Sequence, residues 1–291
     1  MATYNLNDIV LGVDIGGSHI TAAIINLKEK KEIKSTWNRN LINAKGTSHQ
    51  ILQGWASTIL QSMESVETKP EKIRIAMPGP MDYETGICLI QDQDKFRSLY
   101  SLNIKELLAA EIGYDPADIS FHNDAACFLK GELYGGSLYG FDKAIGLTLG
   151  TGLGTSYTSS GKAEDADLWN MGFLEGIAED YISTRWFVKR FYELTGKQVA
   201  DVKELIDNHA GSTDFYQVFS EFSNNLASFI YQFIQRETPL AAVIGGNIAH
   251  ADTYFMKETQ QELNELLGYS FPVKKSFLGE SAILLGAGAS T

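Results

Sequence analysis

The chain has 291 residues, a length that suits one large domain or two modest ones. Its 36 acidic residues outnumber 24 lysines and arginines, and the formal net charge of −12 disfavours a surface that follows nucleic-acid phosphates. With 44% hydrophobic and 21% charged residues, the composition is globular and excludes an intrinsically disordered chain.

Cysteine and histidine spacing gives no sign of a metal or disulfide framework. Cys88 and Cys127 stand far apart and outside any CxxC pattern. The five histidines show no ligand spacing, and we expect His19 and His122 to be structural. The first eight residues lack a signal-peptide pattern, and no stretch approaches the roughly 18 apolar residues of a membrane span. We therefore expect a cytoplasmic protein that binds neither membranes nor nucleic acid.

The first half of the chain alternates between predicted strands and helices. Two β-branched runs between Asp8 and Asn26 flank a Gly-Gly turn and predict a hairpin. The later elements of this half are a helix over 49–64, a strand over 72–77, a helix over 103–112, a strand over 118–122 and a helix from Asn123-Asp124-Ala125 to about Leu133.

The strand, glycine turn and strand pattern returns from Lys143 in KAIGLTLGTGLGTSYTSSG. The elements expected after it are helices over about 174–195 and 214–236, a strand over 240–244, a helix over about 250–267, a strand over 271–277 and an Ala/Gly-rich final helix. The aromatic residues on one face of the second of these helices predict a packed core.

Three glycine turns follow predicted strands, at residues 16–17, 150–154 and 245–246. Backbone N–H groups in such turns can approach an anion because no Cβ stands in the way. Walker and dinucleotide motifs place a helix after their glycines, whereas strands follow the first two turns here. The pattern favours two β-hairpins, one from each of two lobes, that clamp a polyphosphate. Ordinary turn chemistry explains any one of the turns alone.

Two aspartates stand beside these features. Asp14 precedes the first turn among apolar neighbours, where an unpaired carboxylate is costly and a Mg²⁺ ion with retained waters would offset its charge. Asp124 opens a predicted helix, where Asn or Asp is the preferred N-cap. A positioned Asp is also a standard acceptor for the hydroxyl proton in phosphoryl transfer. The cap and the base are compatible roles for Asp124.

Taken in order, five motifs resemble those of the repressor, open-reading-frame and kinase (ROK) family of sugar kinases, and the resemblance spans nearly the whole chain. The motifs are DIGGS at 14–18, Pro78-Gly79-Pro80 through Gly86, Asn123-Asp124-Ala125, LGTGLG at 149–154 and Gly245-Gly246-Asn247. The resemblance implies an α/β, two-lobe actin-like ATPase (ribonuclease H-like) fold with a cleft between the lobes. It also implies an N-terminal lobe over 1–120, a C-terminal lobe over 121–291, a last helix that packs back on the N-terminal lobe, and a homodimer.

The chain departs from the family at its zinc motif. Members carry GExGH followed by CxCGxxGCxE, whereas this chain reads AEDADLW at 163–169 and GIAEDY at 176–181. By position, Glu164 and Asp167 match the Glu and His of the first motif, and Glu179 matches the Glu that closes the second. The resemblance therefore implies a branch without a zinc site.

In that branch, carboxylates form the sugar pocket, since each can accept two hydrogen bonds from vicinal hydroxyl groups. We expect Asp165 and Asp180 to be solvated surface acids instead. Trp169 either stacks on the sugar or fills the interior between the lobes.

The implied activity is a glucokinase-like transfer of the terminal phosphoryl group from ATP to a hydroxyl of a hexose or N-acetylhexosamine, with Asp124 as general base. The implied sugar ligands are Asn123, Glu164, Asp167, Glu179 and Gly79. The implied ATP and Mg²⁺ contacts are Asp14 (to Mg²⁺ through water), Gly16, Gly17, Ser18, Gly150, Thr151, Gly152, Gly245, Gly246 and Asn247.

Alternative functions remain open at this point. A catalytically weak or inactive sugar sensor of the same family would act through protein partners. An actin-like or chaperone ATPase would share the hairpins but need no sugar carboxylates. Polyphosphate is an alternative donor, because relatives that use it share the DIGGS form of the first motif.

Overall fold

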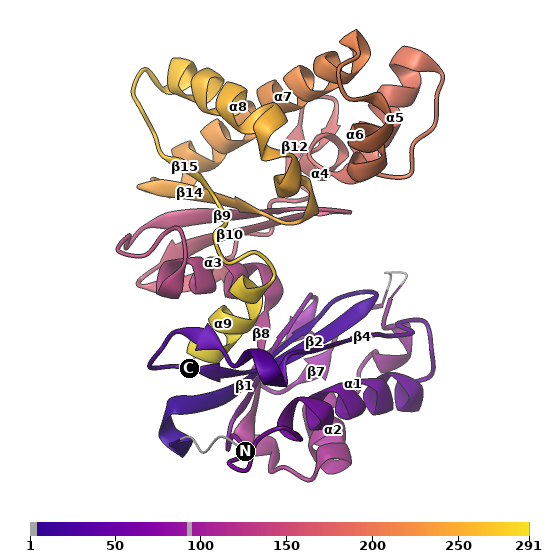
Figure 1. Ribbon diagram of the computed structural model, residues 1–291, viewed down its shortest axis with the longest axis vertical. Coiled ribbons are helices and arrows are strands. Elements are labelled where there is room, and N and C mark those ends of the chain that lie inside the picture. The colour runs from indigo at the N-terminus through magenta and orange to yellow at the C-terminus, as the bar shows by residue number, and fades with distance from the viewer. Residues whose placement is uncertain (1–4, 92–94, 291) are drawn as a thin grey trace. The chain divides into compact units, whose positions relative to one another are not determined.

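The computed structural model describes residues 5–91 and 95–290. The chain forms two compact units: unit 1 contains the chain up to Gly136 and again from Glu280, and unit 2 is Ser137–Gly279. Each unit is centred on its own mixed sheet (Figure 1). This boundary differs from the expected division after residue 120, because a strand over 119–123 spans that position and pairs within unit 1, and the helix after it also packs there.

The sheet of unit 1 has the order β3-β2-β1-β5-β8, with β4 also paired to β2. Its strands are β1 (Ile9–Ile15), β2 (His19–Asn26), β3 (Lys31–Glu32), β4 (Asn38–Leu41), β5 (Ile73–Met77) and β8 (Ile119–Asn123). The predicted hairpin is confirmed as antiparallel β1 and β2, whereas β1, β5 and β8 run parallel. A separate pair, β6 (Met81–Asp82) and β7 (Ile87–Cys88), follows β5.

One face of this sheet buries the apolar core of unit 1. Alternate side chains such as Val13, Ile75 and Phe121 pack there with Trp55 of α1 (Ser48–Met63) and Leu108 of α2 (Ile104–Ile112). Such alternation is the period-2 pattern of a strand with one face on a core. Both helices were predicted from their apolar spacing, and the structure confirms them.

The other face carries α3 (Asp124–Gly135) and α9 (Ser281–Ala289), which pack closely on each other. A Cβ at Gly131 would collide with the backbone of Ala282, and one at Gly286 would collide with the backbone of Cys127. A Cβ at Gly12 of β1 would lie 2.6 Å from the carbonyl oxygen of Leu284. The Ala/Gly-rich composition of α9 therefore lets it lie directly on α3 and on the sheet.

The sheet of unit 2 has the order β11-β10-β9-β14-β15. Its strands are β9 (Ala144–Leu149), β10 (Leu153–Ser159), β11 (Lys162–Asp165), β14 (Ala241–Gly245) and β15 (Val273–Lys275). The long helices α7 (Thr213–Glu237) and α8 (Asp252–Leu267) cover it (Figure 1). The aromatic face of α7 is buried in a core that includes Phe219, Phe222 and Phe255, as the sequence predicts.

The helix expected over 174–195 is interrupted in the structure. Its segment contains the pair β12 (Gly172–Phe173) and β13 (Gly176–Ile177), then α4 (Ala178–Tyr181) and α5 (Thr184–Thr195). Leu174 has a φ of 50°, which a right-handed α-helix does not permit. The apolar spacing in the sequence therefore runs through a turn that breaks the expected helix. The short α6 (Val202–His209) was not predicted; Asp201 caps it by accepting a hydrogen bond from Glu204 N.

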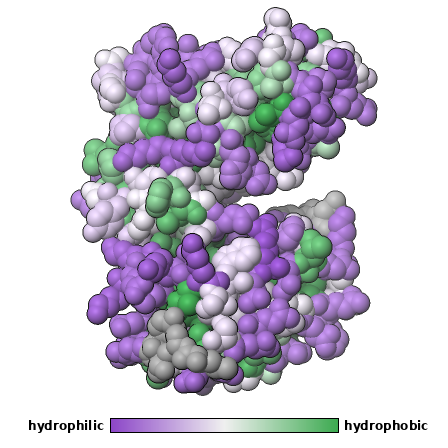
Figure 2. Space-filling model, in the orientation of Figure 1, coloured by the Kyte–Doolittle hydropathy of each residue, from purple (hydrophilic) through white to green (hydrophobic). Residues whose placement is uncertain are grey.

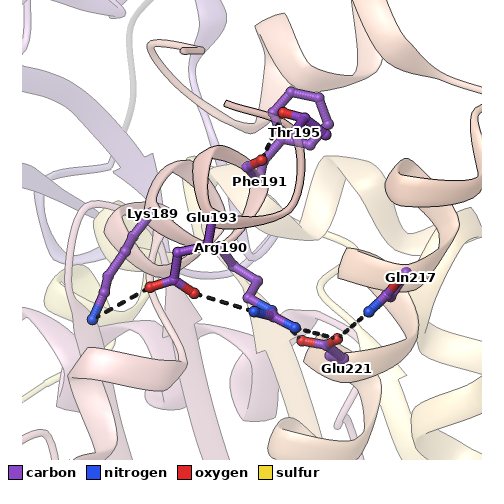
Figure 3. Close-up of polar contacts among 7 residues, drawn as sticks. All are labelled: Lys189, Arg190, Phe191, Glu193, Thr195, Gln217 and Glu221. Atoms are coloured by element: carbon purple, nitrogen blue, oxygen red, sulfur yellow. Dashed lines mark hydrogen bonds and ion pairs between the residues drawn. The ribbon is translucent and has the colours of Figure 1, made fainter. Parts of the chain in front are cut away.

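Ion pairs join α5 to α7. The guanidinium of Arg190 donates to Glu221 from Nε at 2.6 Å and from Nη2 at 2.8 Å, and it also contacts Glu193 (Figure 3).

Figure 2 shows hydrophilic side chains over most of the visible face of each unit. Over residues 5–91 and 95–290, no helix combines the length and the apolar character that a membrane crossing needs.

Candidate active site

The first glycine turn joins β1 to β2. Gly16 N donates to His19 O at 2.9 Å and closes the turn, and Ser18 Oγ lies 2.8 Å from His19 Nδ1. Gly17 and Ser18 are exposed. A Cβ at Gly17 would lie 3.3 Å from Cδ of Lys95, so the glycine leaves room for that side chain. The turn thus presents backbone N–H groups to solvent beside a lysine stem.

Asp14 lies just before this turn in a row of side chains across the sheet. Strand pairing places Arg39, Thr21, Asp14, Ala76 and His122 at successive register positions. Residues paired in this way share one face, which here is the face that carries α3 and α9.

The charge of the Asp14 carboxylate is poorly compensated. Burial, and then the nearby Asp124, raise its pKa to about 7, although Arg39 acts in the opposite direction. Arg39 is itself paired with Glu280 at 2.6 Å. Among the described residues, no group donates a hydrogen bond to the Asp14 carboxylate, so its oxygens suit a Mg²⁺ ion held through water and donor phosphates.

In the part of the chain that the structure describes, protein side chains alone do not build a metal cage. Within the described residues, no three or more His, Cys, Asp or Glu side chains are grouped to hold a metal ion. The two cysteines, Cys88 and Cys127, are both buried in unit 1. His122 is partly buried as well: burial and Arg74 lower its pKa to about 4, and its Nε2 lies 3.0 Å from Ser120 Oγ.

The Asn123-Asp124 pair stands where β8 gives way to α3. Asn123 is the N-cap, because its Oδ1 accepts a hydrogen bond from Ala126 N at 3.0 Å. Asp124 is the first helical residue, and its Oδ1 accepts from Ala125 N at 2.9 Å. The cap that the sequence allowed for Asp124 therefore belongs to its neighbour. Burial raises the pKa of Asp124, while Lys95 lowers it.

Tyr83 connects this pair to the loop that contains Gly79. Its hydroxyl donates to Met77 O at 3.0 Å and accepts from Asn123 Nδ2 at 3.3 Å. A Cβ at Gly79 would lie 3.2 Å from the same hydroxyl. The structure thus brings Gly79 and Asn123 together through a tyrosine that lies within the segment from Pro78 to Gly86 but was not singled out from the sequence.

The second glycine turn joins β9 to β10 in unit 2. Gly150 N donates to Gly152 O at 3.0 Å, and Gly150 O accepts from both N and Oγ1 of Thr184. Leu153 N donates to Glu179 Oε2 at 3.0 Å, and a Cβ at Gly152 would collide with that carboxylate. Thr151, at the tip, is exposed.

Glu179, expected from the resemblance to bind sugar, therefore contacts the second glycine turn. Its other carboxylate oxygen pairs with Arg185 of α5. Neither Thr184 nor Arg185 was singled out from the sequence; both follow the acidic segment without a local pattern of their own. Together with Thr184, Glu179 fixes the backbone of the turn from outside.

The other two acidic residues are exposed. Glu164 accepts a hydrogen bond from Tyr157 OH at 3.1 Å across the β10–β11 hairpin. Asp167 accepts from Trp169 Nε1 at 2.7 Å, and Trp169 O accepts from Glu179 N at 3.0 Å. Asp167 and Glu179 are thus linked through Trp169, whose side chain is 42% exposed and does not fill a core.

The third glycine turn packs against the second. Gly245 ends β14 and pairs with Thr148, and Gly246 has a φ of 85°, a conformation that favours glycine. A Cβ at Gly246 would lie 2.7 Å from Leu149 N. Asn247 begins a 3₁₀-helix after this turn and is exposed. The structure therefore brings two of the three predicted glycine turns together within unit 2.

A groove of about 830 Å³ lies elsewhere in unit 2, between α4, α5 and α7. Its lining includes Asp180, Arg185, Lys189, Arg190 and Glu221, three of which Figure 3 draws. None of the predicted site residues lines this groove. Arg185 nevertheless links the groove to the second glycine turn, because it lines the groove and pairs with Glu179.

Comparison with known proteins places the chain in a family. The sequence model of the ROK family matches residues 10–165. The glucokinase of Thermotoga maritima is 25% identical, with 96% of this chain and 95% of that protein covered. The N-acetyl-D-glucosamine kinase of Haemophilus influenzae is 23% identical, with 96% and 97% covered.

A solved structure supports the same placement. The ROK family glucokinase of Streptomyces griseus, in complex with glucose and AMPPNP, has a TM-score of 0.76 at 19% identity, with 96% of this chain and 98% of that chain covered. This likeness shows the α/β fold of the actin-like ROK kinases, as the sequence motifs imply. With the sequence match over residues 10–165, it follows that the chain belongs to the ROK family.

Proposed function

We propose that the chain is a sugar kinase that transfers the terminal phosphoryl group of ATP to a hydroxyl group of a hexose or an N-acetylhexosamine. The observation that carries the proposal is the position of the Asp124 carboxylate at the capped start of α3. Asp124 is near enough to Asp14 to raise the pKa of Asp14, and Lys95, beside the first glycine turn, lowers the pKa of Asp124. The glucokinase and N-acetyl-D-glucosamine kinase relatives support both acceptor classes.

Asp124 acts as the general base. Burial raises the pKa of its carboxyl group, which makes the carboxylate a stronger proton acceptor than an exposed aspartate. As the sugar oxygen forms its bond to the γ-phosphorus, the hydroxyl proton passes to Asp124. The bond between that phosphorus and the bridging oxygen breaks, and ADP leaves with the electron pair.

Backbone N–H groups bind the donor. In unit 1 the turn of Gly16, Gly17 and Ser18 offers the backbone of its two exposed residues, Gly17 and Ser18. In unit 2 the Gly150–Gly152 turn offers its exposed tip at Thr151. Gly245, Gly246 and Asn247 contact the adenosine part. Asp14 would hold Mg²⁺ through water, and the bound ion supplies charge neutralisation of the donor phosphates.

The acceptor pocket uses Asn123, Gly79, Glu164 and Asp167. Asn123 is held by the Tyr83 hydroxyl, which lies beside Gly79, and Asp167 is held by the Trp169 indole. Because Glu179 is engaged with Leu153 and Arg185, we assign its carboxylate first to the second glycine turn.

The homodimer expected from the resemblance remains a proposal, which light scattering after size-exclusion chromatography tests.

A substrate panel tests this function. ADP release is measured with ATP and Mg²⁺ against glucose, mannose, fructose, galactose, N-acetylglucosamine and N-acetylmannosamine, and then with polyphosphate as donor. We expect sugar-dependent turnover with ATP and at least one member of the panel. Calorimetric sugar binding without turnover from either donor would contradict the kinase and favour a sugar sensor. If the protein shows no sugar binding and no sugar-dependent turnover, the sugar assignment is overturned.

A further inference from the structure

Lys95 extends from a backbone position that is firmly held. Its neighbour Phe96 is fully buried, and Phe96 N donates to Ala44 O at 2.7 Å. The Phe96 ring packs edge-on against Trp55 of α1, with ring centroids 5.6 Å apart. The stem of Lys95 therefore starts from a fixed point on the core of unit 1.

The stem lies against the first glycine turn. A Cβ at Gly17 would stand 3.3 Å from Lys95 Cδ, closer than ordinary van der Waals contact. Gly17 does not have a left-handed φ, so its backbone conformation alone does not demand glycine. The space that the missing side chain leaves at Gly17 is the space along which Lys95 passes.

The charge of the Lys95 ammonium group affects the pKa of Asp124, the proposed base. Lys95 is the charged group that offsets the effect of burial on the pKa of Asp124. A second cation nearby, Arg39, instead acts on Asp14 and is paired with Glu280 at 2.6 Å. The stem of Lys95 therefore lies against the phosphate turn, and its charge is near enough to Asp124 to lower the pKa of that carboxyl group.

We propose that Lys95 is a further catalytic residue, whose ammonium group contacts the phosphoryl group during its transfer from the donor to the sugar. The proposal rests on the proposed kinase function. Phosphoryl transfer places negative charge on the oxygens of the moving group, and a fixed cation beside them stabilises the transition state. The position between the Gly17 turn and Asp124 is where a phosphoryl group must pass to reach a hydroxyl that Asp124 deprotonates.

The test compares Lys95→Met, which keeps an unbranched stem and removes the charge, with Lys95→Arg, which keeps the charge. Lys28→Met, a change at an exposed lysine of unit 1, controls for the loss of one surface charge. Steady-state kcat and KM for ATP and sugar are measured across pH, and melting temperatures confirm folding.

We expect Lys95→Met to lower kcat by about 100-fold or more, the order found when one transition-state contact is removed. We expect the loss to persist at the high-pH plateau, Lys95→Arg to recover part of it, and Lys28→Met to match the wild type. A kcat that returns to the wild-type value at high pH would overturn the proposal, because Lys95 would then act only through the pKa of Asp124.

The remaining outcomes separate this proposal from the kinase function. Sugar-dependent turnover in the wild type with an unchanged kcat in Lys95→Met would overturn the Lys95 proposal alone. Absence of sugar-dependent turnover in the wild type would overturn both. If Lys95→Met has a lower melting temperature than the wild type, both variants are assayed at low temperature, where Lys95→Met is folded, and at the high-pH plateau of kcat. The proposal then requires Lys95→Arg to retain more activity than Lys95→Met. Equal activities of the two variants would overturn the proposal.

Discussion

Asn123 Nδ2 donates a hydrogen bond to the Tyr83 hydroxyl at 3.3 Å, and this contact joins the cap of α3 to the loop that follows β5. Because Asn123 immediately precedes Asp124, the tyrosine fixes one of the proposed sugar ligands beside the proposed base. The Tyr83 hydroxyl thereby fixes the position of the loop that contains Gly79 relative to the helix that begins at Asp124 within unit 1.

Removing that hydroxyl should weaken sugar binding. For Tyr83→Phe we expect KM for the sugar to rise roughly fivefold, since one neutral hydrogen bond contributes about 1 kcal/mol. We expect kcat to change less, because Asp124 keeps its own contact with Ala125 N. Tyr100→Phe, at an exposed tyrosine of the same unit, is the matched control. An unchanged KM in Tyr83→Phe would show that the link does not position the sugar.

Glu179 should affect the donor more than the acceptor. Its carboxylate receives a hydrogen bond from Leu153 N and pairs with Arg185, so Glu179→Ala loosens the second glycine turn. We expect KM for ATP to rise about tenfold, equivalent to about 1.4 kcal/mol, with a smaller change in KM for the sugar. Glu175→Gln, at an exposed position nearby, serves as control. A rise confined to KM for the sugar would instead make Glu179 a sugar ligand.

Asp14 should reduce stability while serving function. Its pKa is about 7 in the folded chain against an ordinary 3.8, so the folded state binds the extra proton and stability falls as pH rises from about 4 to about 7. We expect Asp14→Asn to raise the free energy of unfolding at pH 8 without Mg²⁺, by at most about 4 kcal/mol, and to abolish turnover.

Urea unfolding at pH 8 and pH 4.5 checks this prediction. The two chains should converge at the lower pH, where Asp14 is protonated in the folded state. Asp115→Asn, at an exposed 3₁₀-helix cap, is the matched control for the loss of one carboxylate. A lower stability of Asp14→Asn at pH 8 would mean that the carboxylate stabilises the fold.

Local patterns carried most of what the sequence predicted. The β1–β2 and β9–β10 hairpins follow from β-branched runs around glycine turns, and the start of the helix at Asp124 follows from the Asn123-Asp124 pair. These features depend on a few neighbouring residues, so the sequence was enough to locate them. The α4–α5 break was missed because apolar spacing continues through Leu174, whose positive φ has no sequence signal.

Contacts between distant segments were beyond the sequence. Lys95 reaches the Gly17 turn from a loop that lies far along the chain, and Tyr83 reaches Asn123 in the same way. Glu179 was assigned a sugar role by its motif position, yet its contact is with Leu153, which the fold alone brings near. Such pairs depend on where strands and helices pack, which no local pattern encodes.

The most direct test of the central claim is ³¹P NMR of the sugar product, with wild-type protein and Asp124→Asn, using the panel sugar that turns over fastest. We expect the wild type to form a sugar phosphate and Asp124→Asn to form it at a rate at least about 100-fold lower. Calorimetry should show that Asp124→Asn still binds the sugar. Asp115→Asn should match the wild type. Equal rates of sugar phosphate formation by the wild type and Asp124→Asn would contradict the assignment of Asp124 as the base.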